Sequence, residues 1–427
     1  MMCRCRHIAT SLLLFCLAPF VYAQTPPLVA EPARTANYDD QMHSDTIVVP
    51  MNFRERSEKS DAFYDTLRYR RYKNPITQFL FRSLIRNRDA SDEGPPMLDF
   101  TRNRNYFEHY SGKRIAAVRL TQANVFSPRN PAEKVSWGQR FLDKIHIRTQ
   151  KKQLTQNLLF QVGDTINPYV MGINEEMLRS LPYLSTAYFV VLPDPHDSSA
   201  VIVNIFARDN WSLSADASFG SIENRISVFD RNFLGTGDEI KLTFSSEKGL
   251  KHIGTEIDYT ARNLLGSFTD VTVKMGVGAN SNIGQFTVEH PFILPSDWAF
   301  GFEAGRCYKR EKLSLTDTTY YVNRFRVNGW IGKSWCLNWH NGTNVYIAAS
   351  LGKEQYINRP PVTESLNPFY HNRDLFLFSI GFARRNYFQG NMIYGYGRTE
   401  DIPYGFRVEL VGGRQWEEKL GGRDYWG

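Results

Sequence analysis

The C-terminal half of the chain is a long series of short segments in which apolar and polar residues alternate. Alternation with a period of two places apolar side chains on one face of a β-strand and polar side chains on the other. Each segment is about the 9–11 residues that a tilted membrane-spanning strand needs. The chain is therefore predicted to be all β from Trp211 onward. The clearest apolar files are Ile240–Phe244, Thr255–Ala261, Val271–Val277, Trp298–Phe302, Phe325–Ile331, Val345–Leu351, Phe376–Phe382 and Phe406–Leu410.

A soluble β-sandwich also alternates, with its apolar face turned inward. Here the alternation persists through nearly every segment, and the connecting loops vary in length as they do in membrane barrels. Charged side chains cost little in a wet lumen and a great deal in a sandwich core. We predict an incomplete transmembrane antiparallel β-barrel over 211–427, with roughly 10–12 strands present. Its lumen would hold a polar network of Glu256, Asp258 and Glu303 with Arg324 and Arg326.

Residues 113–210 combine segments of strand alternation with segments of helical spacing, and this pattern predicts one small α+β domain. A first strand begins at Arg114, and a helix is predicted over Gln150–Phe160. A second helix begins at Asn167-Pro168, because asparagine is a favoured N-cap and proline suits the first helical position. Two further strands follow, Tyr188–Leu192 and Val201–Ile205. The order strand, helix, helix, strand, strand occupies about a hundred residues, a usual domain size.

The first residues, 1–23, are predicted to form a secretion signal. Basic residues precede a short apolar core, and Val21-Tyr22-Ala23 predicts cleavage after Ala23. The apolar core is too short to span a bilayer as a stable helix. The segment 24–112 that follows has no strand alternation, and we predict a periplasmic linker with short helices within Ala62–Arg86.

Composition narrows the class of protein. The 427 residues carry a net charge of +7, 14% aromatic residues and a mean hydropathy of −0.41. These values exclude a polytopic helical membrane protein but not a barrel, whose strands alternate. The basic residues are spread along an exported chain, so they do not indicate nucleic acid. After signal removal Cys307 and Cys336 remain on neighbouring predicted strands, either as a disulfide or as two free thiols.

The sequence contains no motif of enzymatic chemistry. It has no Gly-x-Ser-x-Gly elbow, no His-Glu-x-x-His pair and no phosphate-binding glycine loop, and its histidines are scattered. We therefore expect no catalytic, cofactor-binding or metal-binding residues. One short repeat stands out, because Arg231–Gly235 (RNFLG) recurs 31 residues later as Arg262–Gly266 (RNLLG). The offset is about one hairpin, and the repeated Asn and Gly suit turns at the same rim of a barrel.

Two parts of the chain resemble a known superfamily. The run from Leu154 through Gly163-Asp164 and Asn167-Pro168 to Tyr188-Phe189 resembles a POTRA domain. Asn232–Asp238 (NFLGTGD) resembles the first barrel turn that follows such a domain in outer-membrane assembly factors of the BamA and TamA type, a superfamily that includes bacterial surface antigens. The resemblance covers 113–427 and implies a periplasmic POTRA-like domain before a barrel.

The chain departs from that superfamily in three respects. Only one POTRA-like domain is evident, and no Val-Arg-Gly-Phe or Val-Arg-Gly-Tyr element is found. The strand count is also below that of the superfamily, so we interpret the chain as C-terminally truncated, with a genuine smaller barrel as the alternative. Arg398–Gly405 resembles a segment that recurs in relatives, but its chemistry is not evident from the sequence.

The resemblance implies an outer-membrane assembly or translocation factor that binds unfolded clients by strand addition and guides them at the barrel. The alternative function is a passive pore or a structural surface barrel without insertase activity. Expected partners are outer-membrane lipid, unfolded or exported β-barrel clients and periplasmic accessory proteins. The expected location is the bacterial outer membrane, with the N-terminal part in the periplasm. The expected client-binding edge, which the N-terminal segment would otherwise cover, is Ala187, Tyr188, Phe189, Val190, Val191 and Leu192.

Overall fold

The computed structural model divides the chain into two compact units, Met1–Arg86 and Asn87–Gly427. The residues it describes all lie in the second unit: 106–127, 137–221, 223–248, 252–278, 281–294, 297–313, 318–339, 342–363, 366–391 and 399–427. The secretion signal, its cleavage at Ala23 and the predicted helices within Ala62–Arg86 fall outside these residues and stay predictions.

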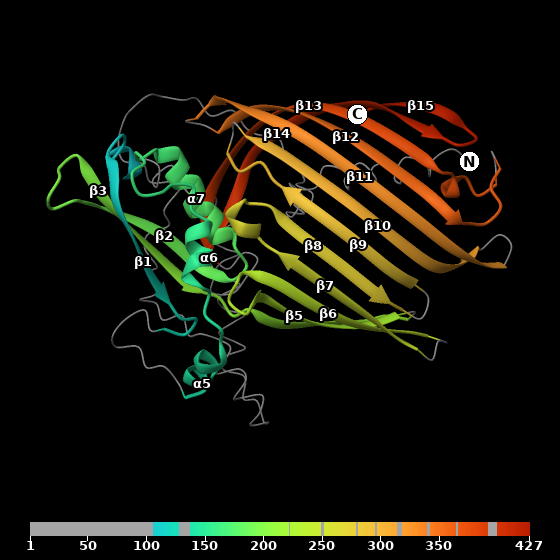
Figure 1. Ribbon diagram of the computed structural model, residues 1–427, viewed down its shortest axis with the longest axis horizontal. Helices are drawn as coiled ribbons and strands as arrows, with labels where there is room; N and C mark the ends of the chain where they lie inside the picture. Colours follow the sequence, from blue (N-terminus) through green and yellow to red (C-terminus); the bar gives the residue numbers. More distant parts are fainter. Residues whose placement is uncertain are drawn as a thin grey trace, which may run out of the picture. The chain divides into compact units, whose positions relative to one another are not determined.

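A small α+β domain precedes a large antiparallel sheet (Figure 1). Its three strands are β1 (Arg114–Ala123), β2 (Leu184–Pro193) and β3 (Ala200–Asp209), in the order β1-β3-β2. Strand β1 is parallel to β3, and β2 is antiparallel to β3. The helices of this domain whose two ends lie in the described residues are α5 (Trp137–Ile145), α6 (Lys151–Gln156) and α7 (Pro168–Ser180). The predicted strands and the second helix are therefore confirmed, and α5 is an additional helix that the prediction did not contain.

Local chemistry sets the limits of α6 and α7. The Asn167 side chain accepts hydrogen bonds from Tyr169 N and Val170 N, so it caps α7 as predicted. Helix α6 is shorter than the predicted Gln150–Phe160, because the Asn157 side chain donates to Gln153 O and ends the helix there. Among the described residues, no helix is long and apolar enough to cross a membrane.

The α+β domain has one hydrophobic core. Alternate residues of β3 are buried in it, as the period of a strand requires. Helix α7 covers the sheet with Met171 and Leu178, and Tyr183 fills the corner before β2. The core also contains Phe107, Ile115, Leu154, Phe160, Ile166, Leu184, Ala187, Phe189, Val191, Val201, Val203, Ile205 and Ala207.

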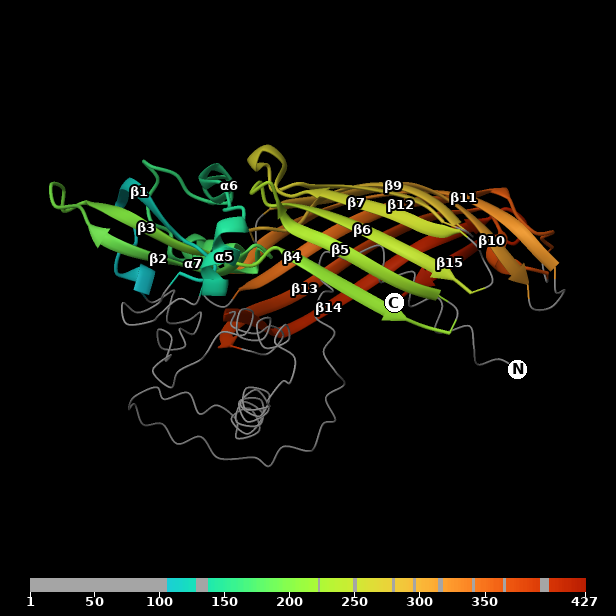
Figure 2. The ribbon, with the colours of Figure 1, turned by 90° about the horizontal axis from the view of Figure 1, so that it is seen from below.

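The remaining strands of the described residues form one 12-stranded sheet in which every strand pairs with its neighbour in sequence (Figure 2). In the described part of the chain, β4 and β15 are the two edges of this sheet. The strand count falls within the predicted range, and the mainly β, antiparallel class is confirmed. The strands are β4 (Leu213–Phe219), β5 (Glu223–Phe233), β6 (Asp238–Glu247), β7 (Ile253–Ala261), β8 (Asp270–Val277), β9 (Ser281–His290), β10 (Trp298–Leu313), β11 (Thr318–Asn338), β12 (Thr343–Asn358), β13 (Arg373–Asn391), β14 (Thr399–Glu417) and β15 (Gly421–Trp426), with short 3₁₀ turns at Leu264–Gly266 and Pro368–Tyr370.

The large sheet exposes its apolar face and covers its polar face, the reverse of a soluble protein. On β13 the side chains of Phe376, Phe378 and Ile380 are exposed, whereas Ser379 between them is buried. The same inversion holds on β12, where Leu351 is exposed and Glu354 is buried. A single exposed apolar residue means little, but continuous files of them mark a surface that something other than water covers.

The predicted polar network on the covered face forms with different partners. Lys274 Nζ on β8 lies 2.6 Å from Glu256 and 3.6 Å from Asp258, so both carboxylates of β7 form ion pairs with this lysine. Arg326 instead binds Glu354 on β12, at 2.9 Å. The prediction named the right kind of interaction and the wrong pairs, because cross-strand register decides which charges meet and alternation alone does not fix register.

The two cysteines on the large sheet are free thiols. Cys307 on β10 lies opposite Arg324, and Cys336 on β11 lies opposite Asn344. Because neighbouring strands do not place them opposite each other, the disulfide alternative is excluded for this structure.

Candidate functional site

The predicted client-binding strand lies at a sheet edge. Strand β2 pairs with β3 on one side only, and its side chains alternate as expected. Tyr188 and Leu192 are exposed, at 39% and 47%, whereas Ala187, Phe189 and Val191 face the core. The structure therefore provides the sheet edge that strand addition requires. An added strand would pair with the outward-facing backbone N–H and C=O groups of β2, so the contacts that these groups already make decide whether a client can bind.

Tyr106, which lies just ahead of β1, covers the end of this edge near Val191. The amide of Val191 donates to Tyr106 Oη at 2.9 Å, and the same hydroxyl donates to Val191 O at 3.2 Å. A tyrosine hydroxyl can act as donor and acceptor at once, so one side chain satisfies both backbone groups. This contact supports the alternative in which residues preceding β1 cover the edge.

Helix α7 covers the other part of the edge. The amide of Phe189 donates to Glu175 Oε1, and Arg179 Nη1 donates to Ala187 O at 3.2 Å. Glu175 and Arg179 are one helical turn apart and form an ion pair at 3.4 Å. Both side chains are almost wholly buried, so the backbone from Ala187 to Phe189 is closed to solvent. This pair was not identified from the sequence.

The same arginine ties α7 to the large sheet. Arg179 Nε and Nη2 bind the two carboxylate oxygens of Asp401 on β14, at 2.7 and 3.0 Å. This is a bidentate pair, the strong form of an arginine–carboxylate contact. Next to it Arg385 on β13 lies 3.7 Å from Glu176 of α7. Asp401 belongs to the segment Arg398–Gly405, whose chemistry the sequence left open; Arg398 itself is outside the described residues.

Burial dominates the titration of the two glutamates of α7. It raises the pKa of Glu175 to about 7, against the opposing effects of Arg179 and of the Phe189 amide. It raises the pKa of Glu176 to about 8, against the attraction of Arg385. Desolvation penalises the ionised form of a carboxyl, which is the cause of both shifts.

Stability of the α+β domain is therefore expected to fall as pH rises from about 5 to about 8. In that window the folded state binds more protons than the unfolded chain, whose carboxyls titrate near 4.5. The free energy of unfolding begins to fall above the pKa that the carboxyl has in the unfolded chain, and the fall is complete above its pKa in the folded domain. Its slope is up to about 1.4 kcal/mol per pH unit for each carboxyl. Urea unfolding at constant ionic strength measures it. Glu176→Gln should flatten the upper part of the curve, and an unchanged slope in this variant would contradict the assignment.

The internal repeat forms two turns of matching geometry at the same end of the large sheet. One turn, Arg231–Gly235, joins β5 to β6, and the other, Arg262–Gly266, joins β7 to β8. Leu234 and Leu265 both adopt left-handed backbone, with φ of 54° and 56°. The following glycines match as well, with φ of 76° and 79°. The repeat is therefore structural and not a chance match.

Both asparagines of the repeat bind the α+β domain at the ends of α6. Asn232 Nδ2 donates to Thr149 Oγ1 at 3.0 Å, and Asn263 Nδ2 donates to Gln156 O at 3.0 Å. In each turn the asparagine oxygen accepts from the amide five residues further on. The side chain thus fixes its own turn and docks that turn on the helix, which explains why asparagine occurs in both copies.

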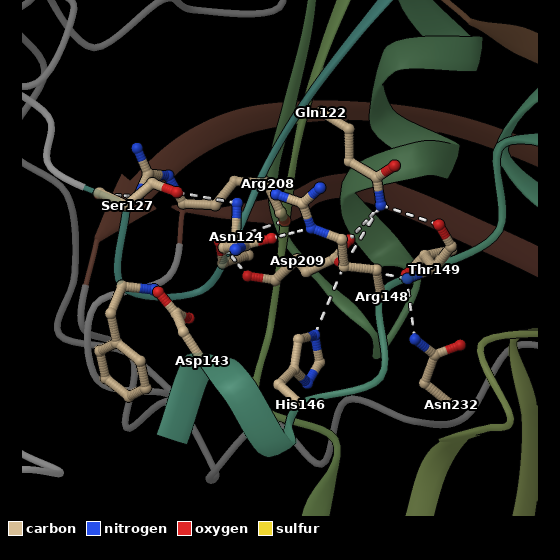
Figure 3. Close-up of polar contacts among 12 residues, drawn as sticks. Gln122, Asn124, Ser127, Asp143, His146, Arg148, Thr149, Arg208, Asp209 and Asn232 are labelled. Atoms are coloured by element: carbon tan, nitrogen blue, oxygen red, sulfur yellow. Dashed lines mark hydrogen bonds and ion pairs between the residues drawn. The ribbon is translucent and has the colours of Figure 1, made fainter. Parts of the chain in front are cut away.

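A buried polar cluster joins the α+β domain to the first of these turns (Figure 3). Asp209, at the end of β3, is fully buried and accepts hydrogen bonds from Gln122 Nε2 and from Thr149 N. His146 Nε2 lies 3.4 Å from the same carboxylate. Because Thr149 also accepts from Asn232, the network is continuous from β3 to the β5–β6 turn. Sequence reasoning did not find Asp209 or His146, since no local pattern distinguishes them from surface residues.

None of this points to catalysis. Within the described ranges, no group of three or more His, Cys, Asp and Glu residues could hold a metal ion. The arrangement instead joins the α+β domain to the large sheet through buried polar and charged side chains, and it positions the edge strand β2. The absence of catalytic and cofactor-binding residues remains a prediction.

Some solved structures are similar to the chain, at low sequence identity. No family model matches the chain, and no curated protein matches it. Among solved structures, BamA from Haemophilus ducreyi lacking POTRA domains 1–3 is similar at 9% identity and a TM-score of 0.33, over 74% of this chain and 81% of that one. CdiB from Escherichia coli is similar at 9% identity and a TM-score of 0.29, over 90% and 92%. CdiB from Acinetobacter baumannii is similar at 9% identity and a TM-score of 0.31, over 71% of this chain and 49% of that one. At these values we draw no conclusion on function from the likeness.

Proposed function

We propose that the chain is an outer-membrane assembly or translocation factor whose α+β domain receives an unfolded client strand. The observation that carries the proposal is the edge strand β2, held by buried contacts against a large sheet whose apolar face is exposed. Such a face suits lipid, and an edge strand suits sequence-tolerant binding through main-chain hydrogen bonds. The superfamily resemblance of the sequence supports the same function.

The contacts on β2 divide the predicted edge into two parts. Glu175 and Arg179 are buried on the part from Ala187 to Phe189, so a client can reach it only after α7 moves. Within the described part of the chain, the outward-facing backbone groups of Val191 are bonded to the Tyr106 hydroxyl, and Tyr106 is itself partly exposed. We therefore place client entry at Val191, with extension toward Ala187 as a second step.

Tyr106→Phe is expected to increase client binding roughly thirtyfold, because it frees two backbone groups that are each worth about 1 kcal/mol to an added strand. The probe is a synthetic peptide with the sequence of β13, Arg373–Asn391, titrated against the full chain in detergent. Tyr110→Phe, one turn further along, is the matched control. Equal affinities for wild type and Tyr106→Phe would contradict strand addition at Val191.

Photocrosslinking locates the bound peptide. A photoreactive residue at the exposed position Leu192 should capture it, and one at Thr121 on the opposite edge strand β1 should not. Phe189→Pro is unsuitable for this purpose, because Phe189 is a core residue that packs against Phe160 with ring centroids 5.5 Å apart.

Depletion in cells distinguishes the proposal from a passive pore. Loss of an assembly factor is expected to lower the levels of other outer-membrane barrels or of one exported client. Unchanged levels, together with conductance of the purified chain in planar bilayers, would favour the pore.

A further inference from the structure

Helix α5 presents aromatic and aliphatic side chains to the outside of the α+β domain. Trp137, Phe141 and Ile145 follow one another at intervals of four residues and are 68%, 49% and 54% exposed. At 100° per residue they share one face of the helix, and the rings of Trp137 and Phe141 stack at 5.9 Å. We propose that α5 lies in the periplasmic surface of the bilayer and binds anionic lipid headgroups. The proposal rests on the membrane location proposed above.

The charges of α5 fit a lipid surface. Arg140 and Lys144 are exposed and lie one turn apart, next to the apolar face, so their head groups can reach phosphates while their stems follow the acyl boundary. The one acidic residue of the helix, Asp143, is occupied elsewhere, because its carboxylate accepts from the amide of Phe126 at 3.2 Å. The exposed side of α5 is therefore cationic and aromatic at once. Tryptophan at such a position is typical of membrane interfaces.

The chain places α5 at the end of the large sheet where a bilayer surface would be. His146 follows α5 directly, and its ring lies 6.0 Å from that of Trp211, two residues before β4. At the start of β4 the apolar side chain of Leu213 is 52% exposed. Figure 1 shows α5 at the end of the sheet where β5 and β6 are joined. Helix α5 is thus held next to the first residues of β4. We infer that it lies at the level where the exposed apolar face of the sheet ends.

A protein groove is the competing occupant for such a helix face. A groove-binding helix usually carries anchors at i, i+3 or i+4 and i+7 over several turns, whereas α5 has nine residues. An interfacial helix needs only an apolar face, a cationic border and a fixed position at the membrane surface. All three are present, so we assign the lipid surface as occupant.

Fluorescence quenching in nanodiscs tests the proposal on the full mature chain. In a Cys307→Ser, Cys336→Ser background, a bimane probe is attached at Phe141→Cys on the apolar face, at Gln139→Cys on the opposite face, or at Leu242→Cys on the exposed face of β6. The nanodiscs contain phosphatidylglycerol and a lipid carrying a doxyl group near the headgroup. Quenching should be several-fold stronger at 141 than at 139, and Arg140→Glu with Lys144→Glu should abolish the difference.

The reference position separates the two proposals. Quenching at 242 but not at 141 overturns the lipid-binding role of α5 and leaves the membrane location intact. Quenching at neither position overturns the membrane location and the role of α5 with it. Equal quenching at 141 and 139 also overturns the proposal, because it shows a helix without a lipid-facing side.

Discussion

Asp401→Ala is expected to lower the opening free energy of the α+β domain by about 3 kcal/mol, because it leaves the buried guanidinium of Arg179 with too little compensating charge. Among the described contacts, Arg179 would keep the more distant ion pair with Glu175, at 3.4 Å, and the hydrogen bond to the carbonyl of Ala187. The bidentate pair is only marginally exposed to solvent, so water cannot replace the lost carboxylate. Hydrogen exchange of the β2 and β3 amides measures the opening free energy without assuming that the whole chain unfolds in one step.

Two comparisons decide whether the loss arises from buried charge. Asp424→Ala removes the partner of Arg414, at 3.6 Å, from a pair that is mostly exposed, and it should cost less than about 1 kcal/mol. The triple variant Glu175→Gln, Arg179→Met, Asp401→Leu removes all three charges of this buried cluster and should recover part of the loss, as replacement of a whole buried ionic group often does. Equal effects of Asp401→Ala and Asp424→Ala would show that Asp401 contributes no more than a surface charge.

The Arg179 contacts also connect the proposed client site to the sheet. One side chain binds the carbonyl of Ala187 on β2 and the carboxylate of Asp401 on β14. A client strand that extends past Val191 must displace Arg179 and Glu175 from β2, and the guanidinium then has Asp401 as its remaining strong partner. If client entry works in this way, Asp401→Ala should weaken α7 and also ease extension of a client toward Ala187.

Sequence alone predicted what local periodicity controls. The strands of the large sheet follow from alternation, and the start of α7 follows from Asn167 and its neighbouring proline. The repeated asparagines were visible too, although their partners on α6 were not. Helix α5 was missed despite the regular spacing of Trp137, Phe141 and Ile145, because a nine-residue helix offers barely two turns of pattern.

The contacts that hold the site together were beyond sequence reasoning for a physical reason. Arg179 and Asp401 are 222 residues apart, and the buried Asp209 is bonded to Gln122 and Thr149, which lie 87 and 60 residues away from it in the sequence. Which charges meet depends on strand register and on the packing of α7, both of which the tertiary structure decides. Composition and spacing can name the residue types of such a site but not its pairs.

Gly235→Ala is expected to undock the β5–β6 turn from the α+β domain at a cost of several kcal/mol. A Cβ atom at this position would lie 2.3 Å from the carbonyl oxygen of Arg148, a contact that backbone must move to relieve. The left-handed backbone, with φ of 76°, adds about 1 kcal/mol of strain for a residue other than glycine. The amide of Gln150 reports the event directly, because it donates to Gly235 O at 2.8 Å and should lose its protection from hydrogen exchange.

Gly266→Ala is the matched control that the repeat itself provides. Its φ of 79° imposes the same strain, but a Cβ there would meet Gln156 at 3.5 Å, an ordinary van der Waals contact. The control should therefore cost only about 1 kcal/mol and leave Gln150 protected. The difference between the two variants isolates the docking contact from the backbone strain. If both variants lose the same free energy, close approach to Arg148 is not what holds the turn, and its hydrogen bonds to Thr149 and Gln150 suffice.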